Sequence, residues 1–154
     1  MKLWKHQEDT LVKTRKLASE GATRIGVALP CGAGKTKIML EIAQAAVAKG
    51  KTVAIYSCRR SNTKQIMDIA ASTGITTGVV ASEFGRDANS AAPLQVCQMQ
   101  TVAARIGDYR HPFPYSDVVI VDEAHQQTGS QAKRVLDKHA AGGSIILGFT
   151  ATPV

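Results

Sequence analysis

Short runs of apolar residues alternate along the chain with segments whose apolar residues recur every three or four positions. Most of the runs are apolar at consecutive positions, which is typical of strands buried on both faces. Such strands belong in a parallel sheet covered by helices, so the pattern predicts a doubly wound α/β domain. The predicted strands are Arg24–Leu29, Thr52–Tyr56, Thr77–Val80, Leu94–Cys97, Asp117–Val121 and Ser144–Phe149.

Two segments have the spacing of amphipathic helices. The first, Lys35–Lys49, stops at Gly50, and glycine is the usual residue in the left-handed turn that ends a helix. In the second, Ser130 precedes apolar positions at helical spacing and is predicted to be the N-cap, with the end of the helix near Gly142–Gly143. Between strands, Glu83–Ala92 is polar and small, which predicts an exposed loop.

The 154 residues are enough for about one domain, so we expect residues 1–154 to fold around a single core, with no repeat or internal linker. No apolar run is long enough to cross a bilayer, and the polar start does not resemble a signal peptide. Cys31, Cys58 and Cys97 are far apart and suggest neither a disulfide framework nor a zinc site. We therefore expect a cytoplasmic protein with no membrane partner.

The formal net charge of +7 is unevenly distributed along the chain. Residues 1–64 contain 13 basic and 4 acidic residues, a balance of +9, whereas the remainder contains 6 and 8, a balance of −2. This asymmetry is compatible with a phosphate-rich partner, but ordinary solvated lysines and arginines on helix faces give much the same balance. Charge alone does not decide between the two.

The strongest motif joins the first predicted strand to the helix at Lys35: Leu29-Pro30-Cys31-Gly32-Ala33-Gly34-Lys35-Thr36. The two glycines allow successive backbone N–H groups to face a phosphate, and the helix N-terminus adds partial positive charge. Lys35 would reach the β- and γ-phosphates, and the Thr36 hydroxyl would bind Mg²⁺. Leu29 stands where GxxxxGK[ST] has its first glycine; the alternative is a glycine-rich turn with an incidental lysine.

A second motif follows the buried run at residues 118–121: Asp122-Glu123-Ala124-His125. Ligands bind at the carboxyl ends of parallel strands, so Asp122 can meet the same Mg²⁺ as Thr36, and Glu123 can orient or deprotonate a water. The alternative for the two acids is a simple acidic turn. A lone histidine such as His125 is usually a satisfied polar side chain.

With these two motifs, the chain resembles the first RecA-like domain of a superfamily 2 helicase of the DEAD/DEAH-box type. Thr150-Ala151-Thr152-Pro153 resembles the third motif of that family, and Gln7 resembles its adenine-reading glutamine. Residues 56–65 resemble the segment that grips the nucleic-acid backbone, with Arg60 and Gln65 matching. Residues 97–102 resemble the TxQTL stretch, with Gln98 in the threonine position.

The resemblance implies a RecA-like P-loop NTPase domain with a mainly parallel sheet and helices on both faces. It assigns ATP and Mg²⁺ to Gln7, to the loop Pro30–Thr36 and to the two acids. It implies that His125, Thr150 and Thr152 couple nucleotide state to domain movement and that Arg60 contacts nucleic acid. The combination of TATP, DEAH and LPxGAGKT is closer to DNA-directed helicases, translocases and restriction-type motors than to RNA DEAD-box proteins, which favours DNA over RNA.

Helicases of this family also need a second RecA-like domain, which supplies arginines to the ATP site. The chain ends at Val154, directly after the third motif, so we expect that domain to act in cis or in trans. Loss of such an arginine costs about 10³–10⁵ in kcat, and the chain alone is therefore expected to be a weak ATPase. The alternative is a stand-alone module that binds ATP without significant catalysis. A small P-loop kinase is disfavoured because no arginine-rich lid follows the core.

Overall fold

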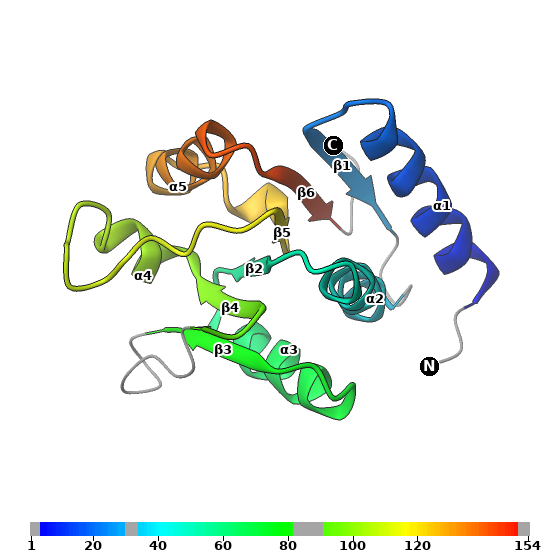
Figure 1. The fold of residues 1–154 in the computed structure, drawn as a ribbon, viewed down its shortest axis with the longest axis horizontal. Helices are drawn as coiled ribbons and strands as arrows, with labels where there is room; N and C mark the ends of the chain where they lie inside the picture. Colours follow the sequence, from blue (N-terminus) through cyan, green and yellow to red (C-terminus); the bar gives the residue numbers. More distant parts are fainter. Residues whose placement is uncertain (1–3, 30–33, 82–90, 151–154) are drawn as a thin grey trace.

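The computed structural model of the chain describes residues 4–29, 34–81 and 91–150, apart from the Arg60 side chain. The strands in this part are β1 (Arg24–Ala28), β2 (Val53–Ser57), β3 (Thr77–Val80), β4 (Leu94–Gln98), β5 (Val118–Val121) and β6 (Ile145–Thr150). They form one sheet in the order β1-β6-β5-β2-β4-β3, and every neighbouring pair is parallel (Figure 1). The predicted strands are thus confirmed to within one residue at each end.

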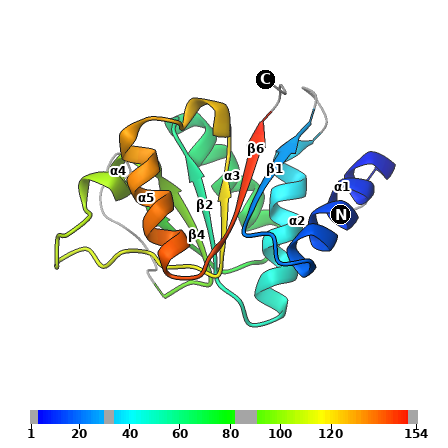
Figure 2. The same cartoon turned by 90° about the horizontal axis from the view of Figure 1, so that it is seen from above.

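The helices of the described residues lie in two layers, one on each face of the sheet. They are α1 (Lys5–Ser19), α2 (Lys35–Ala48), α3 (Arg60–Ser72), α4 (Met99–Ala104) and α5 (Ser130–Ala141). The first three cover one face, and α4 and α5 cover the other (Figure 2). This arrangement confirms the predicted doubly wound α/β fold.

Helix boundaries show where the sequence pattern was right and where it was wrong. The turn after α2 contains Gly50 with φ of +77°, the left-handed conformation expected there. The predicted N-cap at Ser130 is wrong by one residue: the Gly129 carbonyl accepts the first helical hydrogen bond, from the Lys133 N–H at 3.0 Å, so Gly129 is the N-cap. Of the predicted loop Glu83–Ala92, residues 83–90 lie outside the described residues.

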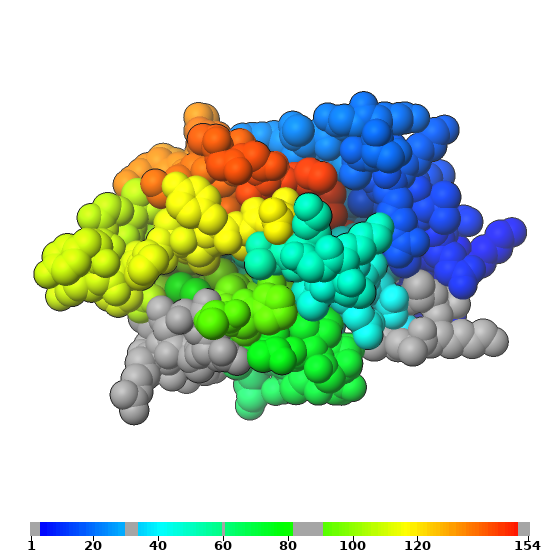
Figure 3. Space-filling view, viewed as in Figure 1, coloured from blue at the N-terminus to red at the C-terminus, as the bar shows by residue number. Residues whose placement is uncertain are grey.

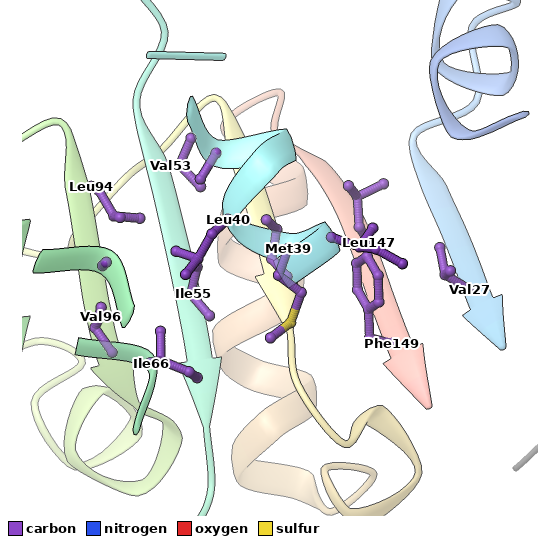
Figure 4. Packing of buried hydrophobic residues seen from close by; sticks show 14 of the residues in the cluster. Val27, Met39, Leu40, Val53, Ile55, Ile66, Leu94, Val96, Leu147 and Phe149 are labelled. Carbon is purple, nitrogen blue, oxygen red and sulfur yellow. The ribbon is translucent and has the colours of Figure 1, made fainter. Parts of the chain in front are cut away.

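Apolar side chains fill the space on both sides of the sheet. Towards α1, α2 and α3, side chains such as Met39 and Leu40 pack on Ile55 and Phe149 (Figure 4). A second cluster lies under α4 and α5. Every residue of β2 is buried, because the strand is central and is covered on both faces. This burial explains why the β2 run is apolar at consecutive positions.

One polar pair is embedded in the cluster beneath α5. The Tyr56 hydroxyl lies 2.6 Å from His139 Nε2, and both side chains are fully buried. The Phe113 ring packs against the His139 imidazole with 4.6 Å between centroids, and Lys138 Nζ lies 5.3 Å from the Phe113 centroid. Burial lowers the pKa of His139 from 6.5 to about 4 by disfavouring the charged imidazolium.

His139 therefore predicts a loss of stability in mild acid. Its folded-state pKa lies below its unfolded value, so its contribution is complete above pH 6.5 and decreases as the pH falls towards 4. The slope is about 1.4 kcal/mol per pH unit, which gives about 3 kcal/mol in all. Asp108, Asp117 and Asp137 have lowered pKa values and affect stability only at more acidic pH.

Urea denaturation at a series of pH values between 7 and 4 measures this effect. His139→Gln is expected to flatten the dependence, whereas the exposed His6→Gln should retain it. Equal slopes in the two variants would show that another group is responsible.

Candidate functional site

The predicted motifs converge at the carboxyl edge of the sheet. All strands point the same way, so the residues that follow β5, the end of β6 and the start of α2 after β1 are brought to one edge (Figure 2). Asp122 and Glu123 follow β5 directly, Thr150 ends β6, and Lys35 begins α2. The sequence separation between Lys35 and Glu123 is 88 residues, and their side chains are in contact.

Lys35 is paired with both acids. Its ammonium donates a hydrogen bond to Glu123 Oε1 and lies 3.4 Å from Asp122 Oδ1. Partial burial would lower the pKa of Lys35, but the hydrogen bond to Glu123 and the two carboxylate charges outweigh it and raise the pKa above its ordinary value. The lysine is therefore held as a cation and is already surrounded by anionic oxygens.

Asp122 is the most deeply buried acid of this group. It is 5% exposed, and its Oδ1 atom is buried without a hydrogen-bond partner. Burial raises the pKa of Asp122, the Lys35 charge opposes that effect, and the Glu123 charge adds to it. The 3.4 Å ion pair with Lys35 is a long contact for this buried oxygen, and a hard cation would satisfy the oxygen better, so the residue fits a Mg²⁺ ligand.

Glu123 has a backbone conformation that is unusual for a side-chain-bearing residue. Its φ and ψ are both 51°, in the left-handed region, and it caps the 3₁₀ turn Ala124–Gln126. This conformation costs about 1–2 kcal/mol and persists where the surroundings impose it. Close packing is one such constraint: a Cβ at Gly148 on β6 would lie 3.2 Å from the Ala124 Cβ. The bend aims the Glu123 carboxylate back at Lys35.

His125 connects the acids to the end of β6. Its Nε2 lies 3.4 Å from Glu123 Oε2, and its Nδ1 shares a 2.8 Å hydrogen bond with Thr150 Oγ1. Lys35, Glu123, His125 and Thr150 thus form a continuous series of polar contacts between residues that come from three different motifs. A change at any one of them alters the environment of the next.

Gln7 contacts the end of the glycine-rich loop. It is 1% exposed, and its Oε1 accepts a 2.8 Å hydrogen bond from the Trp4 N–H. Gly34 caps α2 with φ of +71°, and a Cβ placed on it would overlap the Gln7 amide nitrogen. The structure therefore brings Gln7 and Gly34 together, as a shared nucleotide site requires.

The remaining predicted residues are only partly described. Thr36 is half-buried in the first turn of α2. Arg60 begins α3 just after β2, at the same edge of the sheet. Pro30, Cys31, Gly32 and Ala33 lie outside the described residues, as does Thr152.

Sequence reasoning missed a set of amide side chains near the acids. Gln127 is buried beside Asp122, and Gln126 and Gln100 contact Cys58 in the turn after β2. Glutamines are ordinary in polar turns, and these contacts join residues that are far apart in sequence. The parallel pairing of β2 with β5 brings Gln126 and Gln127 to this turn, and the pairing of β2 with β4 brings Gln100 there.

Two cavities lie elsewhere in the molecule. One of about 810 Å³ is lined by residues that include Thr52, Gln95 and Arg105, and one of about 340 Å³ by residues that include Arg15 and Lys49. The described linings of both cavities lack Lys35, Asp122, Glu123, His125 and Thr150. The candidate site is therefore a surface formed by strand ends and a helix start, distinct from either cavity.

The whole sequence, residues 1–154, matches the model of the family described as "Type III restriction enzyme, res subunit". The chain belongs to this family. Its six-stranded, all-parallel sheet with helices on both faces is the RecA-like α/β fold that the motifs indicated. No curated protein matches the sequence.

Solved structures share the fold of this res-subunit domain. Three of them cover 99% of the chain. They are a nuclease-deletion mutant of the Type ISP restriction-modification enzyme LlaGI with a DNA substrate mimic (21% identity, TM-score 0.71), the Sulfolobus solfataricus SWI2/SNF2 ATPase core with dsDNA (16%, 0.73) and the UvsW helicase of bacteriophage T4 (18%, 0.73). The chain spans 18%, 32% and 53% of these proteins respectively.

No helix in the part of the res-subunit domain that the structure describes combines the length and apolar content needed to cross a membrane.

The contact between Gly34 and Gln7 predicts an unusually costly alanine substitution. Gly34→Ala introduces both a left-handed alanine and an overlap with a buried amide, so we expect it to destabilise the domain by about 1 kcal/mol more than strain alone. Gly21→Ala is the matched control, because its φ is +93° and nothing lies near its Cβ. Chemical denaturation of the two variants measures the difference. Equal losses would show that Gln7 moves aside at no cost.

Proposed function

We propose that this chain binds Mg-ATP at the carboxyl edge of its sheet, as the ATP-binding half of a DNA helicase or translocase. The contact of Lys35 with Asp122 and Glu123 carries the proposal, because it unites a phosphate-binding lysine with the acids that metal binding and hydrolysis need. Residues 1–154 act as one domain, and its activity depends on a second RecA-like domain.

The loop residues Pro30–Gly34 and the start of α2 would hold the phosphates, with Lys35 exchanging its carboxylate partners for β- and γ-phosphate oxygens. Gln7, next to Gly34, would contact the adenine. The Thr36 hydroxyl and the Asp122 carboxylate would hold Mg²⁺, which when bound neutralises charge on the phosphates. The buried Asp122 Oδ1, which makes an ion pair with Lys35 but no close hydrogen bond, supports this assignment.

Once Lys35 turns to phosphate, the Glu123 carboxylate is freed to orient the attacking water and accept its proton. His125 contacts both Glu123 and Thr150, so a movement of the Glu123 carboxylate would shift His125 and, through it, the end of β6. We assign the coupling of nucleotide state to domain movement to these residues together with Thr152.

DNA is the proposed nucleic-acid partner. Two of the similar structures are of proteins in complex with DNA or a DNA mimic, and they support DNA over RNA. Arg60, at the start of α3, would contact the phosphate backbone, which gives affinity and register without reading bases. The second RecA-like domain, in cis or in trans, would supply the arginines that complete the ATP site.

Glu123→Gln tests the hydrolytic role. With a second RecA-like domain supplied, it is expected to reduce DNA-stimulated ATP hydrolysis by about 10²–10⁴-fold, because the amide cannot accept a proton, and to leave Mg-ATP binding intact. The exposed Glu20→Gln is the matched control. Steady-state hydrolysis with and without single-stranded DNA, and nucleotide binding by titration, provide the measurements. A wild-type chain that fails to bind Mg-ATP would contradict the proposal.

Arg60→Ala tests the nucleic-acid contact. We expect weaker binding of single-stranded DNA for all sequences alike and a decrease of about one in the slope of log affinity against log salt. The exposed Arg59→Ala is the control, since it changes the same charge one residue away. Fluorescence anisotropy at several salt concentrations measures both. An equal effect of the two substitutions would indicate a diffuse basic surface instead of a specific contact.

A further inference from the structure

Side chains from three other segments converge on the turn that follows β2. The Gln100 amide donates to the Cys58 carbonyl at 3.2 Å, and Cys58 Sγ lies 3.6 Å from Gln126 Oε1. Ser57 shares a short hydrogen bond with Thr63 in the first turn of α3. The space-filling view in Figure 3 shows the opposite edge of the sheet, where the loop between α2 and β2 lies. The contact between Cys58 and Gln126 joins the segments that follow β2 and β5. The turn that leads into Arg60 is thus tied to the turn that follows the acids.

Gln127 connects the two strand ends through hydrogen bonds from a single side chain. It is 7% exposed, and its Nε2 donates to two main-chain carbonyls, those of Asp122 and Tyr56. The Tyr56 carbonyl also accepts the Asp122 N–H at 2.9 Å. One side-chain amide therefore bridges Tyr56, near the end of β2, and Asp122, directly after β5, and neither strand end can shift without changing a bond to Gln127.

The oxygen of this amide is in a different situation from the nitrogen. Within the described part of the chain, Gln127 Oε1 is buried and makes no hydrogen bond. A buried oxygen in that state is unfavourable, so the side chain occupies this place in spite of a cost that a smaller or apolar residue would avoid. The two hydrogen bonds that Gln127 donates to the Tyr56 and Asp122 carbonyls offset this cost.

We propose that Gln127 is a positioning residue that couples DNA bound at the turn after β2 to the placement of Asp122 and Glu123. This inference rests on the proposed function. A shift of the β2 end reaches Asp122 through Gln127, and a shift of the turn reaches Glu123 through Gln126, whose N–H donates to the Glu123 carbonyl at 2.8 Å. Gln127 acts through the backbone and contacts neither phosphate nor DNA.

The test measures coupling between two ligands. The affinity of the chain for a fluorescent oligo(dT) is determined by anisotropy with and without a non-hydrolysable ATP analogue and Mg²⁺, and the ratio is the coupling factor. Gln127→Met keeps a similar length but lacks the N–H donors. The control is Gln131→Met on the exposed face of α5. We expect a wild-type factor of about 5–150, unchanged in the control and reduced to about 1–2 in Gln127→Met.

A purely structural role would weaken each ligand singly or lower thermal stability without changing the ratio. A Gln127→Met variant that keeps the wild-type ratio therefore overturns the inference, as does a wild-type chain that binds both ligands without coupling. Failure of wild type to bind nucleotide is different, because it refutes the proposed function and the inference with it. Should Gln127→Met not fold, the exposed Gln126→Met decides: a coupling factor at least halved supports the inference, and an unchanged factor overturns it.

Discussion

Every contact at the candidate site depends on the common direction of the strands. In a parallel sheet the carboxyl ends share one edge, so Lys35 after β1 and the acids after β5 meet although β6 lies between the two strands. Reversing any of these strands would carry its functional residues to the opposite edge. The helices that cover both faces are what allow parallel pairing, because they bury strands that are apolar on both sides.

The ion pairs of Lys35 mean that a phosphate would have to compete with Asp122 and Glu123 for the lysine ammonium. A partly buried cation next to two carboxylates satisfies all three groups while no phosphate is bound. Under the proposed function, nucleotide would displace the carboxylates from the lysine. The same rearrangement would then make Glu123 available to water and Asp122 available to metal, so that charge balance would link nucleotide binding to activation.

The sequence predicted the elements with strong local signals. Runs buried on both faces identified the strands, and the spacing of Gly34, Lys35, Asp122 and Glu123 identified the motifs that the fold then placed together. It could not locate the helix start at Gly129, because the Ser130 hydroxyl is an equally good local cap. Nor could it find Gln127, whose importance comes from two carbonyls brought together by strand pairing. Sequence patterns predict single helices and strands, whereas the contacts of Gln127 arise only when two strands pair.

Tyr56 contributes both to the core beneath α5 and to the carboxyl edge of the sheet. Its hydroxyl is bonded to His139 beneath α5, and its carbonyl accepts the Asp122 N–H and the Gln127 amide at the functional edge. The hydrogen bond in the core and the hydrogen bonds at the candidate site thus depend on the same residue. A substitution of His139 that aims at tolerance of acid would therefore need to keep the phenol in place, because the same residue holds the backbone of Asp122.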